Sequence, residues 1–323
     1  MTKYGIVSVL ILLTALMRVL LRRVLPKQAL ADCWLLCLGV LLLPWQFHTS
    51  PRLYGLLPQA LVRVLSRASA LHQAALPVTC AVSAALLTAL CAVYARELLH
   101  YHRACPAQEE TVRRWAAKHP LRRPLRICRS GRVQTPVCCG VLFPVIVLPE
   151  SFDAADEPRL NCVLTHEYCH LLRFDPLWKL LALVCVCLYW YLPAAWLLCV
   201  LLRRDLEFAC DESVLESGVP EKFYARTLLE MALRCGTSDA LAAQFSAGQV
   251  SRRVDHILCY HRRPVLRMLC AALLLTLAVG FAAAPSVPAS AEAAQAHLIS
   301  ERRVLTVPLL PEERALCFPE EAP

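Results

Sequence analysis

Five long apolar stretches alternate with polar segments along this chain. Four of them have about the length that a helix needs to cross the hydrocarbon core of a bilayer. The fifth carries Lys179 near its start and Pro193 inside, so its pattern fits either one more span or a helical hairpin that dips into the membrane. The four are Tyr4–Leu21, Ala29–Phe47, Leu76–Ala95 and Val265–Ala284, and the fifth is Leu177–Leu202.

Polar segments at 97–176 and 203–264 flank the fifth stretch, and together they are long enough to form one modest domain with its own core. Within the first segment, short β-branched runs bounded by Gly and Pro predict strands, and the remainder has a helical pattern. The predicted strands are Leu125–Cys128, Val141–Phe143 and Val145–Leu148.

Composition and pattern together predict a mainly α, multi-pass membrane protein with a small α+β, zincin-like domain. The chain is 58% hydrophobic, and its mean hydropathy of +0.49 is too high for an ordinary soluble domain. We expect three transmembrane helices and their loops in 1–96, the polar domain with its apolar hairpin at 177–202 in 97–264, a last transmembrane helix at 265–284 and a loosely attached outer tail at 285–323.

Basic residues predict the orientation of these spans. The net charge is +9, and Arg and Lys crowd the first short loop, the segment after Leu76–Ala95 and the segment before Val265–Ala284. Such loops face the cytoplasm. A re-entrant hairpin at 177–202 keeps both later basic segments on one side, so we expect the polar domain to be cytoplasmic.

The motif His166-Glu167-x-x-His170 carries the most specific chemistry. Two histidines four residues apart lie on one helix face and can bind one zinc ion, and the intervening glutamate can act as general base. Acidic residues and Pro158 just before the motif favour the start of a helix. A helix with two surface histidines and a solvated Glu167 is the alternative.

Catalytic zinc needs a third protein ligand. Glu207 and Asp211 lie at i and i+4 in the polar segment that follows the hairpin. Glu207 is the candidate ligand, and Asp211 could hydrogen-bond a ligand histidine from outside the metal shell. The alternative is a solvated charged helix, the interpretation we give to Asp205 and Glu212.

Other signals are weaker. The 18 cysteines include no C-x-x-C pair and many lie in apolar stretches, so we interpret them as free thiols, with Cys169 and Cys210 in packing roles. The basic run from Arg113 to Arg129 has few aromatic residues, and we expect no direct nucleic-acid binding.

Six motifs follow one another along the chain: Thr135-Pro136 to Gly140, Phe143–Pro149, His166–Asp175, Pro193–Trp196, Arg204–Asp211 and Tyr224–Leu229. With these motifs the sequence resembles the membrane zinc peptidases typified by the BlaR/MecR β-lactam-sensing antirepressors. The resemblance covers about residues 1–284 and implies zinc on His166, His170 and Glu207, Glu167 as catalytic base, and a cytoplasmic active site. Only about 39 residues follow Ala284 and no S-x-x-K motif occurs, so we expect no penicillin-binding sensor domain in this chain.

We therefore expect a zinc-dependent metalloendopeptidase with one Zn²⁺ ion. Its expected partners are the lipid bilayer, a second copy of the chain as a homodimer, and a protein substrate such as a transcriptional repressor or the chain itself. Two alternatives stay open: a protease for membrane-protein quality control, and a non-enzymatic, zinc-containing signalling scaffold. The oxyanion-stabilising residue is undecided among His256, His261 and Tyr224.

Overall fold

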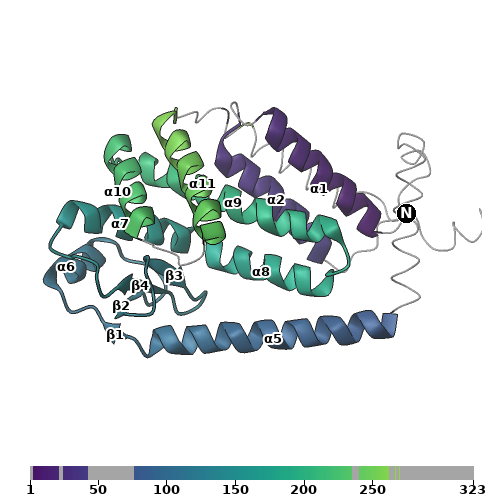
Figure 1. The fold of residues 1–323 in the computed structure, drawn as a ribbon, viewed down its shortest axis with the longest axis horizontal. Helices are drawn as coiled ribbons and strands as arrows, with labels where there is room; N and C mark the ends of the chain where they lie inside the picture. Colours follow the sequence, from purple (N-terminus) through teal and green to yellow (C-terminus); the bar gives the residue numbers. More distant parts are fainter. Residues whose placement is uncertain are drawn as a thin grey trace, which may run out of the picture.

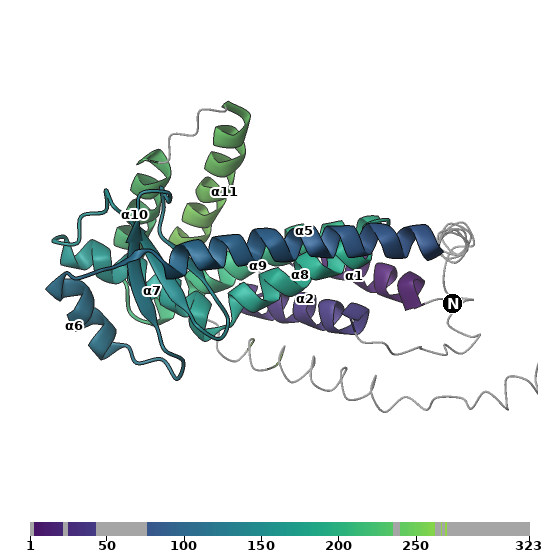
Figure 2. The ribbon, with the colours of Figure 1, turned by 90° about the horizontal axis from the view of Figure 1, so that it is seen from below.

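The structure is a computed structural model that describes residues 3–21, 25–42, 76–234 and 240–261, with the isolated positions 266 and 269. Long helices run side by side in one half, and a small sheet with shorter helices lies at the other end (Figures 1 and 2). The mainly helical fold with a small sheet is confirmed. The elements are α1 Lys3–Leu20, α2 Lys27–Leu42, α5 Leu76–His102, β1 Cys105–Pro106, α6 Glu110–Lys118, β2 Arg126–Ser130, β3 Val137–Cys139, β4 Val145–Pro149, α7 Glu157–Leu172, α8 Asp175–Leu188, α9 Pro193–Glu216, α10 Glu221–Arg234 and α11 Ala240–Leu258.

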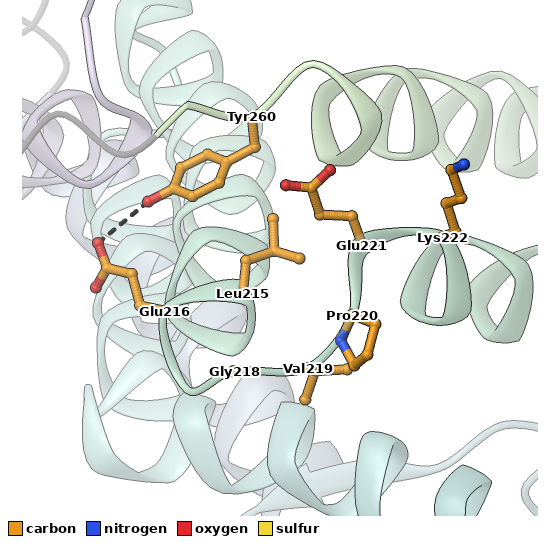
Figure 3. A pocket seen from close by; sticks show the side chains of 8 residues that line it. All are labelled: Leu215, Glu216, Gly218, Val219, Pro220, Glu221, Lys222 and Tyr260. Carbon is orange, nitrogen blue, oxygen red and sulfur yellow. Dashed lines mark hydrogen bonds between the residues drawn. The ribbon is translucent and has the colours of Figure 1, made fainter.

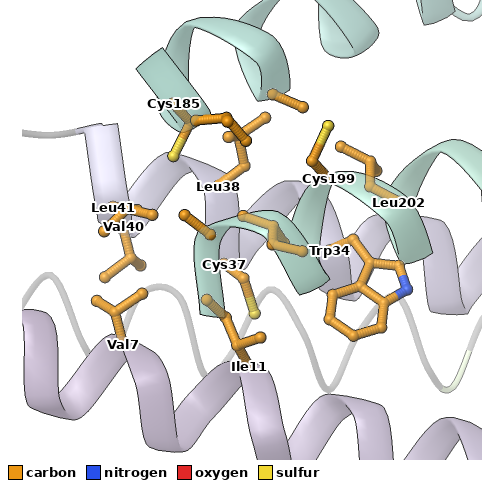
Figure 4. Packing of buried hydrophobic residues seen from close by; sticks show 14 of the residues in the cluster. Val7, Ile11, Trp34, Cys37, Leu38, Val40, Leu41, Cys185, Cys199 and Leu202 are labelled. Atoms are coloured by element: carbon orange, nitrogen blue, oxygen red, sulfur yellow. The ribbon is translucent and has the colours of Figure 1, made fainter. Parts of the chain in front are cut away.

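Helices α1, α2, α8 and α9 pack around one apolar core, in which side chains such as Trp34 and Leu38 are fully buried (Figure 4). Two acids of α9 tie these helices together. Buried Asp205 accepts hydrogen bonds from Arg18 Nε at 2.8 and 2.9 Å and from Trp34 Nε1 at 2.7 Å. Buried Glu212 accepts from the first backbone N–H groups of α2, at 3.0 and 3.2 Å. The interpretation of both acids as solvated charges was therefore wrong, because each compensates a partner inside the fold.

Helix α5 is the one described helix that is long and apolar enough to cross a membrane. Its buried side chains are Thr79 and Ser83, while apolar ones such as Val78 and Val93 are more than half exposed. By the same measure α1 and α2, of 18 and 16 residues, do not qualify. The predicted span Val265–Ala284 lies outside the described residues apart from positions 266 and 269, so the multi-pass topology stays a prediction.

The sheet has the order β1-β2-β4-β3, with β2 parallel to β4 and β3 antiparallel to β4 at one edge. The predicted strand Val141–Phe143 is wrong, since these residues form the turn between β3 and β4. Gly140 begins that turn at φ +83°, and Leu142 and Phe143 point outward, 73% and 61% exposed. The β-branched and aromatic run thus lies in a turn that glycine initiates.

The apolar stretch 177–202 folds as two helices, α8 and α9, that meet at Leu192, with Pro193 in the first turn of α9. Helix α9 continues beyond the apolar stretch and brings Glu207 next to α7. Helix α11 crosses α9, and at its end Tyr260 Oη donates to Glu216 at 3.2 Å, beside the Gly218 turn that leads to α10 (Figure 3). This contact joins the residues that follow α11 to the end of α9, the helix that carries Glu207.

Candidate metal centre

Helix α7 presents the motif from inside the fold. Asp156 caps its first turn by accepting from Arg159 N at 3.1 Å, and Pro158 lies in that turn. Leu164 and Leu171 pack on the sheet side and are fully buried. The motif residues are buried as well, 3–7% exposed, which excludes a helix with surface histidines and a solvated glutamate.

The two histidines and Glu207 converge on one point. The distance from Glu207 Oε2 to Nε2 is 3.9 Å for His166 and 3.6 Å for His170. Zinc bonds of about 2.0–2.2 Å in a tetrahedron place ligand atoms about 3.4 Å apart. The two carboxylate–imidazole distances are close to that value, so these three side chains fit a zinc ion. Arg253 Nη2 lies 3.4 Å from His166 Nε2, and this guanidinium group must move aside when the ion is bound.

A partner behind each ring fixes which nitrogen faces this point. His170 Nδ1 lies 2.6 Å from buried Asp175 Oδ2, at the start of α8. His166 Nδ1 lies 2.8 Å from Tyr224 Oη of α10, and Tyr224 donates to Asp211 Oδ1 at 2.5 Å. Such outer partners select the tautomer of metal-binding histidines. The sequence suggested Asp211 for this task, but its Oδ1 is 3.9 Å from His166 Nδ1, with Tyr224 between them.

Lys179, His170 and Arg253 together keep Glu207 ionised. Lys179 Nζ lies 2.7 Å from Glu207 Oε1, and Arg253 Nη1 lies 3.3 Å from Oε2. Burial by itself would raise the pKa of Glu207, but the neighbouring cations, Lys179 first, hold that pKa well below its ordinary value. Arg253 also donates to Asp211, at 2.7 and 2.9 Å. The carboxylate is thus charged, with Oε2 toward the histidines.

Glu167 is buried near the thiol of Cys138, which comes from the edge strand β3. Cys138 of β3 and the Glu167 carboxyl influence each other's ionisation, and burial raises the pKa of both groups. A carboxyl with a raised pKa is a better proton acceptor near neutral pH. The contact also places β3, an edge strand of the sheet, directly beside the motif helix.

Cys210 is an alternative third ligand, because a ligand atom of each of His166, His170 and Cys210 falls within 4.8 Å of the others. Its thiol, however, lies on the outer side of His166, 3.5 Å from Nδ1, which already contacts Tyr224. Burial raises the pKa of Cys210 well above its ordinary value, so the thiol stays protonated. Geometry and charge both favour Glu207.

Sequence reasoning missed several neighbours of the centre. Lys179 drew attention only as a charge that interrupts an apolar stretch, and Arg253 only as part of a basic run. Tyr224 was a candidate for oxyanion stabilisation, yet its hydroxyl lies behind His166. The other two candidates face elsewhere, with His256 Nε2 3.2 Å from Glu212 and His261 Nδ1 3.0 Å from a backbone oxygen of its own turn.

Part of the chain is similar to known proteins. The chain is 29% identical to the regulatory protein BlaR1 of Bacillus licheniformis over 170 residues, which are 50% of this chain and 28% of that protein. It is 24% identical to the methicillin resistance mecR1 protein of Staphylococcus aureus over 147 residues, 43% of this chain and 25% of that protein. The matched part thus spans about a quarter of either relative. The sequence model of the BlaR1 peptidase M56 family matches residues 64–257, and the chain belongs to this family.

Proposed function

We propose that the protein is a membrane-bound zinc metalloendopeptidase. The observation that carries this proposal is the convergence of His166 Nε2, His170 Nε2 and Glu207 Oε2 beside the buried carboxyl of Glu167. Membership of a peptidase family supports it.

Each residue has a role that follows from its contacts. A zinc ion held by His166, His170 and Glu207 would polarise the scissile carbonyl and make water nucleophilic at neutral pH. Glu167 takes the proton of the attacking water and returns it to the leaving amine. Asp175 and Tyr224 hold the two imidazole rings, and Lys179 fixes the third ligand.

The substrate is a cytoplasmic protein, such as a transcriptional repressor, or the cytoplasmic part of the chain itself. Support comes from two relatives, one named a regulatory protein and the other a methicillin resistance protein. The apolar, largely exposed helix α5 supports attachment to the cell membrane. The basic segments that flank the domain support a cytoplasmic active site.

Replacement of the general base tests this function. Glu167→Gln should leave zinc bound and reduce cleavage by about 100-fold or more. Zinc content of the purified full-length protein and new protein N-termini in cells that carry each form are the measurements. Glu157→Gln, an exposed acid at the start of the same helix, is the matched control. Retained cleavage in Glu167→Gln would contradict the mechanism, and cleavage of many unrelated membrane proteins would indicate quality control.

A further inference from the structure

A basic cleft of about 980 Å³ adjoins the candidate centre, between the ends of α1 and α2, helix α9 and helix α11. Seven of its fifteen lining residues are Lys or Arg, against two acids. Lys179, Glu207 and Arg253 belong to both the centre and the wall of the cleft. A molecule bound in the cleft therefore lies next to the reacting groups.

Some of the cations already have partners. Lys179 and Arg253 pair with Glu207, and Arg18 pairs with Asp205. Arg203 and Arg252 are exposed, and within the described part of the chain neither forms an ion pair. The Nε of Arg252 donates to Gly248 O of its own helix at 2.9 Å. Both guanidinium groups are therefore available to pair with an anion that binds in the cleft.

Arg204 supplies an independent sign of a ligand. Arg204 lines the cleft and is half-buried, and its Nε is a buried donor with no hydrogen-bond partner among the described residues. Buried donors are nearly always paired, so an unpaired one calls for an acceptor that enters the cleft. Carboxylates match guanidinium groups in charge and in geometry.

We propose that this basic cleft binds an acidic segment of the polypeptide that the centre cleaves. The proposal rests on the proposed peptidase function, since it assigns a substrate class to the same site. A polypeptide fits better than an anionic lipid, because the large apolar side chains in the wall are few, Val200, Phe208 and Val250. Acyl chains would need a more extended apolar surface.

Binding is measured first, without cleavage. Full-length zinc-loaded Glu167→Gln protein in phosphatidylcholine nanodiscs is titrated with a fluorescent peptide whose only charged side chains are three consecutive glutamates, and with its glutamine counterpart. In this background, Arg203→Gln with Arg252→Gln should lower the affinity for the glutamate peptide about five-fold. High salt should lower this affinity as well. The matched control, Arg103→Gln with Arg113→Gln, removes two exposed arginines outside the cleft and should not change binding.

Equal affinities for the two peptides, or equal effects of the two arginine pairs, would overturn the proposal. The proposal would also be overturned if the cleft arginines affected binding of phosphatidylglycerol added to the nanodiscs and had no effect on binding of the glutamate peptide. The wild-type protein is then profiled on a proteome-derived peptide library, and acidic residues at a constant distance from the cleaved bond would support the proposal. Cleavage without a preference for acidic residues would overturn the proposed role of the cleft and leave the peptidase function standing. Selective binding of the glutamate peptide without any cleavage would overturn the peptidase function and leave the role of the cleft standing.

Discussion

At the residue scale, the two motif histidines are held from behind in different ways. His170 contacts the carboxylate of Asp175 directly, whereas His166 reaches Asp211 through the hydroxyl of Tyr224. Each acid pairs with an arginine, Asp211 with Arg253 at 2.7 Å and Asp175 with Arg173 at 3.4 Å, so the difference is that a phenol lies between His166 and its acid. The two rings therefore depend on their surroundings to different degrees.

Loss of the Tyr224 hydroxyl should weaken zinc binding by about 10-fold, because the His166 ring is then no longer held with Nε2 toward the metal. The measurement is the zinc affinity of Tyr224→Phe by competition with a chelator. Tyr168→Phe, which removes a hydroxyl bonded to Pro120 O at 3.0 Å, is the control. Equal affinities for the two variants would exclude a positioning role for Tyr224.

The zinc contents of two variants, Glu207→Gln and Cys210→Ala, test which residue is the third ligand. Glu207→Gln should lower zinc affinity by more than about 100-fold, since it removes a charged ligand and leaves the half-buried ammonium group of Lys179 without its carboxylate partner. Cys210→Ala should retain zinc, because its thiol is protonated and faces the outer side of His166. The opposite order of metal contents would assign the site to the thiol.

At the element scale, the turn between β3 and β4 decides where the edge strand lies. Gly140 has φ +83°, and an added Cβ would lie 2.2 Å from Phe143 O. Gly218, at φ +96°, has nothing within 4 Å of such an atom. Replacing either glycine by another residue strains the backbone, because φ is positive at both positions. Only the replacement of Gly140 adds a steric clash.

Gly140→Ala should therefore destabilise the protein by more than about 2 kcal/mol, and Gly218→Ala by about 1 kcal/mol. Thermal unfolding of both variants with the same detergent gives the comparison. Because β3 carries Cys138 beside Glu167, Gly140→Ala should also reduce cleavage. A larger loss of stability in Gly218→Ala would contradict this account of the turn.

At the scale of the whole molecule, the centre lies between two differently built halves. Its motif helix α7 packs on the sheet, and Glu207 comes from α9, which is anchored in the apolar helices by Trp34 and Asp205. Helix α5 leads directly into strand β1 of the sheet and exposes apolar side chains along its length. We therefore expect α5 to anchor the sheet and the motif helix in the membrane.

A charge in the middle of α5 tests that anchorage. Leu86→Arg should disfavour membrane insertion of this helix by about 3 kcal/mol. Leu142→Arg, on a loop where the side chain is 73% exposed, should have no such effect. The fraction of protein that resists alkaline extraction from membranes measures the outcome, and equal extraction of the two variants would contradict a span at α5.

The sequence alone determined what depends on spacing along one helix or on local composition. The i, i+4 histidines, the start of their helix and the apolar stretches are such features, because helical geometry places neighbours without reference to the rest of the chain. Glu207 was also within reach, since its segment follows the hairpin directly. The tertiary structure alone decided the contacts between distant segments: Lys179 and Arg253 on Glu207, Tyr224 between His166 and Asp211, burial of Asp205, and β3 at 137–139. These depend on which faces pack together, and packing joins residues that no local pattern relates.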